Sequence, residues 1–297
     1  MVPGDGDLGS GQEEPSAEAT VLRMLLGTQL RRLRETAGIS AEKAGYEIRA
    51  SRSKISRMET GRVGLKVRDV EDLLTLYGVT SEQQRDKVLT LARRSRAPEW
   101  WAKYHDILPD WFETYLGLES AASSIRSFET QFVPGLFQTE AYARAVTRLG
   151  HQTALAGEIE RRVGLRLQRQ ELFTRAQPPR VWAIIDEAVL RRPVGGADVM
   201  RTQLRRLVEA ARRPRVTLQV VPFARGGHAA ASGSFSILRF EERDLPDVVY
   251  IEQLTSAVYL DQRQDIEHYL EVVDQLSGEA LTPGDTAGFI EHVASET

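Results

Sequence analysis

The feature that most constrains this chain is the segment SAEKAGYEIRASRSKISRMETG, which occupies residues 40–61. Ser40 and Ser51 are of a type that favours helix N-caps, and Gly61 suits the position just beyond a helix C-terminus. The spacing predicts a short helix after Ser40 and another helix over residues 52–60. Too few residues separate the two for anything but a tight turn.

The helix predicted over residues 52–60 has one apolar side and one basic side. Ile55 and Met58 are three residues apart and face inward together, so Arg52 and Arg57 lie on outward or flanking faces. Ala44 in the preceding helix is small enough for the two helices to cross closely. An exposed helix with a basic N-terminal half has the shape and charge that the major groove of DNA accepts.

Three residues of this helix are candidates for reading base edges: Arg52, Ser53 and Arg57. Arginine can donate two hydrogen bonds to guanine O6 and N7, and serine can bond to either base type or to a phosphate. Helix ends and the loop that follows typically supply phosphate contacts. The phosphate candidates are Ser40, Ser51, Lys54, Thr60, Arg62, Lys66 and Arg68. The alternative is an ordinary α-hairpin with solvated basic residues.

The net charge of −3 conceals a strong division along the chain. Residues 21–96 carry 17 lysines and arginines against 9 acidic residues, whereas residues 97–297 carry 22 against 28. A basic N-terminal third on an acidic remainder indicates a nucleic-acid-binding module joined to a domain of another kind.

Three parts are predicted along the chain. Residues 1–18 are rich in Gly, Asp, Glu, Ser and Pro and poor in apolar residues, which predicts a disordered tail. Residues 19–97 contain five helical segments and predict a mainly α-helical bundle. Residues 98–297 mix helical and strand patterns and predict a larger α+β domain with a sheet of four or five strands. The strand patterns fall at 181–185, 216–221, 234–240 and 248–254.

A recognisable set of residues lies between positions 21 and 80: Arg34, Ala44, Ile48, the run SRSKISRME at 51–59, and Gly61. With this set, the segment resembles the Xre-type (lambda/434 repressor-like) helix-turn-helix family. The resemblance implies that the residues after the N-cap of the third helix read bases, which here are Arg52, Ser53 and Arg57. It also implies an ion pair between Arg34 of the first helix and Glu59 at the end of the third.

One residue departs from the pattern of that family. Gly45 stands in the second helix where the family usually has alanine. Glycine costs about 1 kcal/mol in a helix interior, so the second helix is expected to be softer.

Six segments of the second half form another recognisable set, at 134–146, 159–173, 185–196, 199–207, 218–235 and 248–260. With them, this part resembles a domain of unknown function found in many actinobacterial (Streptomyces-like) Xre-type regulators. The resemblance implies a transcription regulator encoded beside a small partner protein, with an antitoxin-like or developmental role. It implies no particular ligand.

The second domain has three open interpretations: partner binding that tunes DNA binding, small-molecule sensing, and catalysis. For sensing, seven aromatic residues are candidates for a ligand pocket or, alternatively, for a seam between the two domains. They are Trp100, Trp101, Trp111, Phe112, Tyr115, Phe128 and Trp182. The polar residues suited to such a pocket are Arg126, Glu129, Gln138 and Glu187. The candidates for partner binding, which suit a core equally well, are Tyr250, Leu254, Val258 and Tyr259.

Catalysis has little support in the sequence, and no catalytic residue is assigned. Asp186 and Glu187 follow a strand, but a helix N-cap with an acid in the first turn explains them better than a general acid–base pair. Gly195-Gly196 is expected to form a linking turn, and a glycine turn is expected to expose His228 at the surface.

The remaining expectations concern partners and surroundings. The chain has no cysteine and its five histidines are far apart, so no metal site or cofactor is predicted. No apolar run approaches 18 residues and no signal segment opens the chain, so a cytoplasmic protein without a membrane anchor is expected. Since one helix reads only about 3–5 base pairs, we expect a homodimer on double-stranded DNA.

Overall fold

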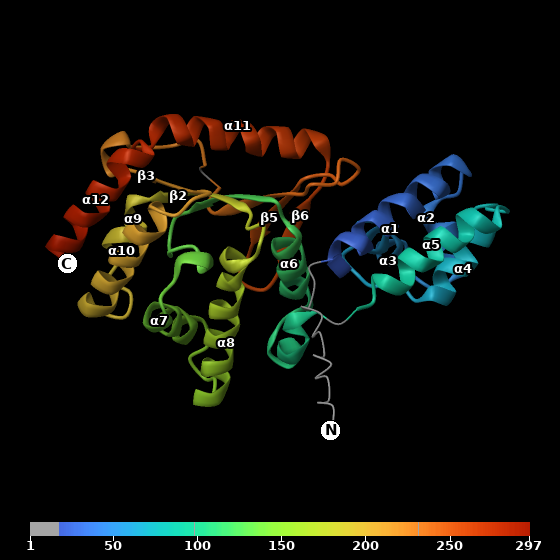
Figure 1. Ribbon diagram of the computed structural model, residues 1–297, viewed down its shortest axis with the longest axis horizontal. Helices are drawn as coiled ribbons and strands as arrows, with labels where there is room; N and C mark the ends of the chain where they lie inside the picture. The colour runs from blue at the N-terminus through green and yellow to red at the C-terminus, as the bar shows by residue number, and fades with distance from the viewer. Residues whose placement is uncertain (1–17, 98, 231) are drawn as a thin grey trace, which may run out of the picture. The chain divides into compact units, whose positions relative to one another are not determined.

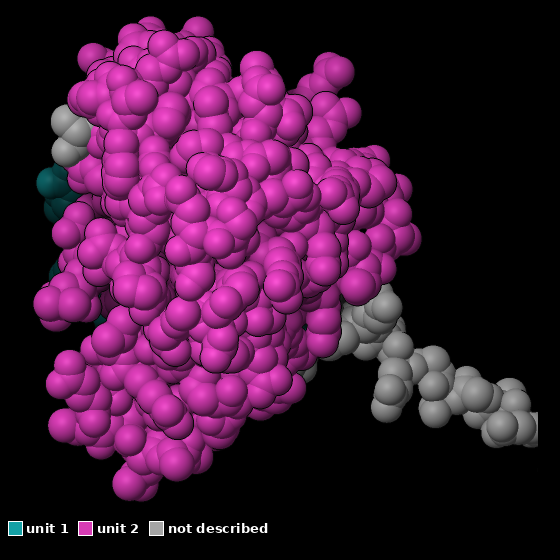
Figure 2. All heavy atoms as spheres, turned by 90° about the vertical axis from the view of Figure 1, so that its left-hand side faces the viewer, with its two compact units in different colours: residues 1–102 teal, residues 103–297 magenta. Residues whose placement is uncertain are grey.

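The computed structural model describes residues 18–297 except positions 98 and 231 (Figure 1). The predicted disordered tail therefore lies outside the described residues, apart from its last position. The chain divides into two compact units, residues 1–102 and 103–297, which are coloured separately in Figure 2. Each unit has its own secondary structure and core.

The described part of the first unit contains a bundle of five α-helices, as the sequence predicts. Their bounds are α1 Glu18–Thr36, α2 Ala41–Glu47, α3 Arg52–Glu59, α4 Val67–Leu76 and α5 Glu82–Arg94. Three of them begin at serine N-caps whose hydroxyls accept a backbone N–H, namely Ser40, Ser51 and Ser81. Local capping chemistry thus sets where these helices start.

One apolar cluster holds the five helices together. It joins Leu26 and Leu30 of α1 to Ile55 and Met58 of α3, and it continues into α4 and α5. Gly27 allows α1 to approach α3 this closely, because a Cβ at Gly27 would lie 2.5 Å from the carbonyl oxygen of Met58. The core therefore fixes α3 against α1 through its buried side.

The structure gives a reason for the unusual glycine in α2. A Cβ at Gly45 would lie 2.5 Å from the carbonyl oxygen of Ala50, in the turn between α2 and α3. The carbonyl oxygen of Gly45 also accepts a hydrogen bond from the Ala50 N–H at 2.8 Å. The turn is this tight because no side chain separates it from α2.

The second unit is an α+β fold built on a six-stranded sheet with the order β3-β2-β1-β4-β5-β6. The strands are β1 Ser124–Glu129, β2 Arg180–Asp186, β3 Val216–Val221, β4 Phe235–Arg239, β5 Val248–Glu252 and β6 Ala257–Leu260. β1, β2 and β3 pair in parallel, and β4, β5 and β6 complete the sheet antiparallel. The sheet has more strands than the four or five expected, since the sequence patterns identify neither β1 nor β6.

Helices surround this sheet (Figure 1). The α-helices are α6 Asp110–Ala121, α7 Glu140–Gly150, α8 Ala156–Arg169, α9 Glu187–Arg191, α10 Ala197–Ala211, α11 Arg263–Glu279 and α12 Pro283–Glu296. The 3-10 helices of this unit are η2 Gly135–Phe137, η3 Gln170–Thr174 and η4 Phe223–Arg225, while η1 Trp100–Ile107 spans the boundary between the two units. In Figure 1, α11 runs along one face of the sheet, while α6, α7 and α8 lie on the other side.

The two faces of the sheet differ in chemistry. Successive residues of a strand point to opposite faces. Phe128 of β1 and Ile237 of β4 belong to the apolar cluster that includes Val273 and Leu276 of α11. The opposite face carries Ser127 and Ser236, which are direct neighbours in the register of β1 and β4. One face is therefore packed in an apolar core, and the other face carries polar side chains.

The close approach at Gly45 generates a prediction. Gly45→Ala should lower the free energy of unfolding of the first unit by about 1–2 kcal/mol, because overpacking outweighs the gain in helix propensity. Native-state hydrogen exchange of the α1 and α3 amides measures that free energy in this unit alone. Glu47→Ala, an exposed change in the same helix, serves as the control. A Gly45→Ala chain that is more stable than wild type would contradict the argument.

Candidate functional site

The α3 helix of the first unit divides sharply into a buried and an exposed side. Ile55 and Met58 are each 1% exposed, as the spacing predicts. Arg52, Ser53 and Arg57 are exposed, and the Arg52 side chain keeps 75% of its accessible area. The exposed side thus presents two guanidinium groups and a hydroxyl to solvent.

Arg52 also has a neighbour on α2. Its Nε lies 3.2 Å from Oε1 of Glu42, and both side chains are exposed. Ion pairs of this kind contribute little to stability, about 0–1 kcal/mol, and are screened by salt. Arg52 can therefore exchange Glu42 for an acceptor on a ligand at low cost.

The residues predicted to contact phosphate fall into two structural groups. Ser40 and Ser51 use their Oγ atoms as N-caps, which accept hydrogen bonds from Lys43 N at 3.2 Å and Lys54 N at 3.1 Å. Thr60 Oγ1 donates to the carbonyl oxygen of Ser56 at 3.0 Å. These three hydroxyls therefore already have partners inside the bundle.

The basic members of that set lie nearer to solvent. Lys66 and Arg68 are exposed at the start of α4, and Arg62 and Lys54 are half-buried. Arg68 Nε lies 3.9 Å from Oδ2 of Asp72, one turn along the same helix. Lys66 and Arg68 therefore place positive charge on the element that follows α3.

An ion pair connects α1 to the end of α3, where the resemblance places it. Arg34 donates two hydrogen bonds to Glu59, Nε to Oε1 at 2.5 Å and Nη2 to Oε2 at 2.8 Å. Its Nη1 donates to the carbonyl oxygen of Ile39 at 2.9 Å. The side chains of Arg34 and Glu59 are 12% and 8% exposed, and the hydrogen bond with Glu59 raises the pKa of Arg34.

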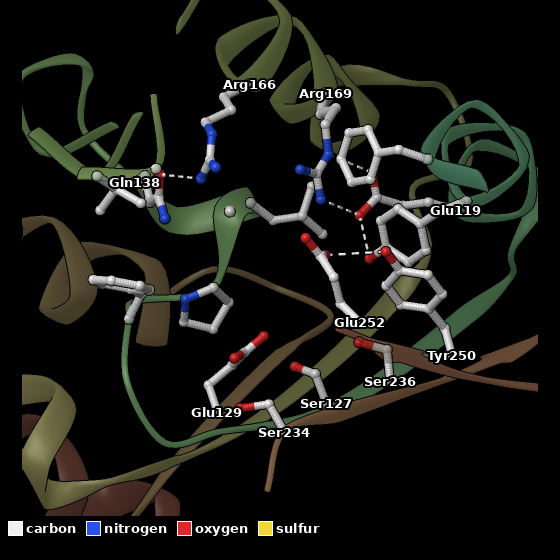
Figure 3. Close-up of a pocket in the computed structure, with 18 of the residues that line it drawn as sticks. Glu119, Ser127, Glu129, Gln138, Arg166, Arg169, Ser234, Ser236, Tyr250 and Glu252 are labelled. Atoms are coloured by element: carbon white, nitrogen blue, oxygen red, sulfur yellow. Dashed lines mark hydrogen bonds and ion pairs between the residues drawn. The ribbon is translucent and has the colours of Figure 1, made fainter. Parts of the chain in front are cut away.

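The second unit contains a cavity of about 810 Å³ between the polar face of its sheet and the helices above it. Figure 3 shows residues that line it. Trp111, Phe112 and Tyr115, three of the aromatic candidates, lie on its wall. Glu129 and Gln138, two of the polar candidates, also line it.

Other candidates for this pocket lie elsewhere, which corrects the prediction. Phe128 and Trp182 pack on the α11 side, because strand alternation turns them away from the cavity. Trp100 and Trp101 belong to the first unit, where their rings meet edge to face at 5.5 Å. Arg126 lies over the ring of Trp182 on the α11 side of the sheet.

A buried ion pair that the sequence did not reveal forms one wall of the cavity. Arg169 of α8 donates two hydrogen bonds to Glu119 of α6, both at 2.8 Å, and the side chains are 8% and 3% exposed. The Tyr115 hydroxyl donates to Glu119 at 2.8 Å, and Arg169 lies over the rings of Phe112 and Tyr115. The only sequence signal is the spacing of two arginines, at 166 and 169, on one helical face.

The other charged groups of the cavity are paired less completely. Arg166 Nη1 donates to Gln138 Oε1 at 3.1 Å, and burial lowers the pKa of Arg166 to about 10, so the group stays protonated. Burial raises the pKa of Glu129 to about 7. Glu252, at the end of β5, accepts a hydrogen bond from the Tyr250 hydroxyl at 3.0 Å.

The residues considered for catalysis have structural roles in a helix cap, a turn and a buried hydrogen-bond network. Asp186 is the N-cap of α9 and accepts a hydrogen bond from Ala188 N at 2.7 Å, which confirms the prediction that it caps a helix. Gly195-Gly196 forms the expected turn, with φ angles of 76° and 93°. Glu187 is buried and accepts hydrogen bonds from Arg191 and from the Phe223 N–H, so it does not face the cavity.

The prediction for His228 was wrong. Its side chain is only 15% exposed and lies edge to face against Phe128, with ring centroids 5.0 Å apart. Its Nε2 is 3.7 Å from Oδ2 of Asp186. The glycine turn before it folds the imidazole into the protein instead of presenting it to solvent.

The candidates for partner binding are divided between core and surface. Tyr250 is buried, Tyr259 is half-buried, and Leu254 and Val258 are exposed, Leu254 to 98%. Within the described residues, no group of three or more metal-ligating side chains is placed to hold a metal ion. None of the described helices combines the length and apolarity that a membrane crossing requires.

Comparison with protein families assigns both units. A model described as a helix-turn-helix domain matches residues 25–88, and the Domain of unknown function (DUF5753) matches residues 112–292, more than half of the chain. The chain belongs to the DUF5753 family. Neither the curated proteins nor the solved structures contain a match. The helix-turn-helix match indicates DNA binding and transcription regulation, and it favours a non-enzymatic regulator.

The geometry of the Arg34–Glu59 pair generates the second prediction. Glu59→Gln should lower the free energy of unfolding of the first unit by about 2–3 kcal/mol, because the guanidinium loses its charged partner in a mostly buried site. The double variant Arg34→Met/Glu59→Leu should recover part of that loss, since it removes both charges. Hydrogen exchange of α1 and α3 amides provides the measurement.

Glu71→Gln is the matched control, because Glu71 is an exposed glutamate on α4 of the same unit. It should change stability by less than about 0.5 kcal/mol. Equal effects of Glu59→Gln and Glu71→Gln would show that the buried pair does not hold α3 in place.

Proposed function

We propose that this protein is a sequence-specific DNA-binding transcription regulator whose α3 helix enters the major groove of its operator. The observation that carries the proposal is the division of α3 into a side fixed in the core by Ile55 and Met58 and a side that exposes Arg52 and Arg57. The helix-turn-helix match over residues 25–88 supports the same role.

In this proposal, three residues read bases and a surrounding set contacts phosphates. Arg52 and Arg57 each pair with guanine, and Ser53 bonds to a base or a phosphate. The phosphate set is Ser40, Ser51, Lys54, Thr60, Arg62, Lys66 and Arg68. The capping hydroxyls of Ser40 and Ser51 mark helix N-termini, where backbone N–H groups and the helix dipole favour a phosphate.

The proposal extends to assembly and regulation. The protein acts as a homodimer on a roughly palindromic site in the cytoplasm, since one helix reads too few base pairs to select a site in a genome. The second unit dimerises or senses a partner protein or a ligand. We retain the Xre-type, actinobacterial assignment and a small protein encoded nearby as parts of this proposal.

A second candidate function is an antitoxin-like or scaffold protein that acts mainly through protein binding. The observation that favours it is the exposure of large apolar side chains on the second unit, including Leu254 at 98% and Leu155 at 80%. Salt dependence separates the two functions, because a true DNA binder loses affinity steeply as salt rises. A scaffold would retain no DNA even at low salt.

The test begins with selection of bound duplexes from a random pool, followed by titration of the selected duplex at fixed salt. Arg52→Ala and Arg57→Ala should each weaken binding by about 1–3 kcal/mol and relax preference at one base position. Lys66→Ala should weaken binding to all sequences alike, because it removes a phosphate contact.

Arg93→Ala is the matched control, since Arg93 is an exposed arginine on α5 that is assigned no DNA contact. It should leave sequence preference unchanged. If Arg52→Ala and Arg57→Ala also left affinity and preference unchanged, the assignment of α3 as the base-reading helix would be wrong.

A further inference from the structure

The cavity of the second unit has a cationic side and an acidic side. In Figure 3, the Arg166 guanidinium lies on one side, and Glu129 lies opposite with the hydroxyls of Ser127, Ser234 and Ser236. The charged groups of the cavity differ in whether another residue of the protein neutralises them.

Arg169 is fully engaged and belongs to the cavity wall. Its two hydrogen bonds to Glu119 and its position over Phe112 and Tyr115 use both its charge and its planar faces. A Cβ at Gly135 would lie 3.0 Å from Arg169 Nη1, so the backbone also closes around it. Arg169 and Glu119 therefore cancel each other and leave little for a ligand.

Arg166 is in a different position. Within the described part of the chain, no carboxylate lies within 4 Å of its guanidinium, and its one hydrogen bond goes to the neutral Gln138. Gln138 is held in turn by its Nε2, which donates to the carbonyl oxygen of Val133 at 2.8 Å. The protein thus holds a half-buried cation at the cavity wall with no carboxylate beside it, so its charge is available to an anion in the cavity.

The acidic side of the cavity likewise has a charged group without an oppositely charged partner. Glu129 is the last residue of β1, and burial raises its pKa to about 7, although a hydrogen bond with the Ser234 side chain opposes this shift. No ion pair joins Glu129 to a cation among the described residues. Ser127 and Ser236 are each 7% exposed, and neither hydroxyl has a hydrogen-bond partner among the described residues. These hydroxyls and this carboxylate line the cavity, where they can form hydrogen bonds with a bound group.

The position in the fold also fits a binding site. Glu129 lies at the carboxyl end of β1, the strand where the parallel half of the sheet meets the antiparallel half. Ligands of α/β sheets typically bind outside the carboxyl ends of strands at such a change in topology. The volume of about 810 Å³ lies within the range of roughly 300–1,000 Å³ for small-molecule sites.

We propose that this cavity binds a small zwitterionic molecule of the amino acid or short-peptide class. Its carboxylate pairs with Arg166, and its protonated amine lies beside Glu129. Arg169 and Glu119 already neutralise each other and pair with neither group. The serine hydroxyls of the sheet face complete the polar contacts. Apolar wall residues, such as Trp111, Val133 and Leu136, would contact side chains of the ligand.

The charges exclude simpler occupants. An anion alone would satisfy Arg166 but would add negative charge opposite Glu129 and Glu252. A cation alone would leave Arg166 without an anionic partner. A ligand with both signs satisfies both sides at once. This inference deepens the ligand-sensing part of the proposed function, and binding at the cavity does not depend on base reading by α3.

The test measures thermal unfolding of the full chain with pools of free amino acids, dipeptides and tripeptides, followed by calorimetric titration of the best member. At a probe concentration 100 times its Kd, the unfolding midpoint of the second unit should rise by roughly 5–10 °C. The same probe with an acetylated amine or an amidated carboxylate should bind roughly 10- to 100-fold more weakly.

Two variants assign the contacts. Arg166→Gln should remove the preference for a free carboxylate, and Glu129→Gln the preference for a free amine. Arg148→Gln and Glu271→Gln, exposed changes outside the cavity, are the matched controls and should bind like wild type. Arg52→Ala should also bind like wild type, so that a failure of base reading and a failure of this proposal are distinguishable.

The proposal is overturned if no pool with free termini shifts unfolding of the second unit. It is equally overturned if probes with blocked termini bind as tightly as free ones, or if the two cavity variants bind like the controls. Should either variant fail to fold, the comparison of free and blocked termini on the wild-type chain still decides.

Discussion

The proposed recognition surface on α3 depends on the attachment of this helix to α1. Arg34 and Glu59 join the two helices through two charge-assisted hydrogen bonds, and Gly27 lets their backbones approach closely. The pair costs desolvation, so its contribution is orientation more than raw stability. With its inner side held in this way, α3 can expose arginines at its outer side without losing its place in the bundle. The residues proposed to bind DNA are thereby separate from those that fold the unit.

The sheet of the second unit likewise has one face that packs in the core and one face that carries polar groups. The face toward α11 is sealed by apolar side chains such as Phe128 and Ile237, and this face stabilises the fold. The opposite face is free to carry serines and a carboxylate, because helices cover it at a distance that leaves a cavity. Arg166 is half-buried in the wall of this cavity, and its hydrogen bond goes to the neutral side chain of Gln138.

Local signals explain why the first unit could be predicted well. The N-cap at Ser51 and the spacing of Ile55 and Met58 lie within one helix, so a single stretch of sequence contains them. The cavity depends on residues that are far apart in the sequence. Glu119 and Arg169 are separated by 50 positions, and no sequence periodicity predicts that they pair. Strand β1 was missed because each of its two faces carries both polar and apolar side chains, so its six residues show no regular alternation. His228 was misplaced because a glycine turn does not say which way the next side chain points.

The most direct test of the account is hydrogen–deuterium exchange of the full chain with and without a duplex selected from a random pool. Contacts along α3 and the start of α4 predict slower exchange over residues 51–68 when the duplex is bound. Little change is expected in the α11 core of the second unit at saturating duplex. Protection confined to the second unit, with α3 exchanging as in the free protein, would contradict the claim that α3 is the DNA-reading element.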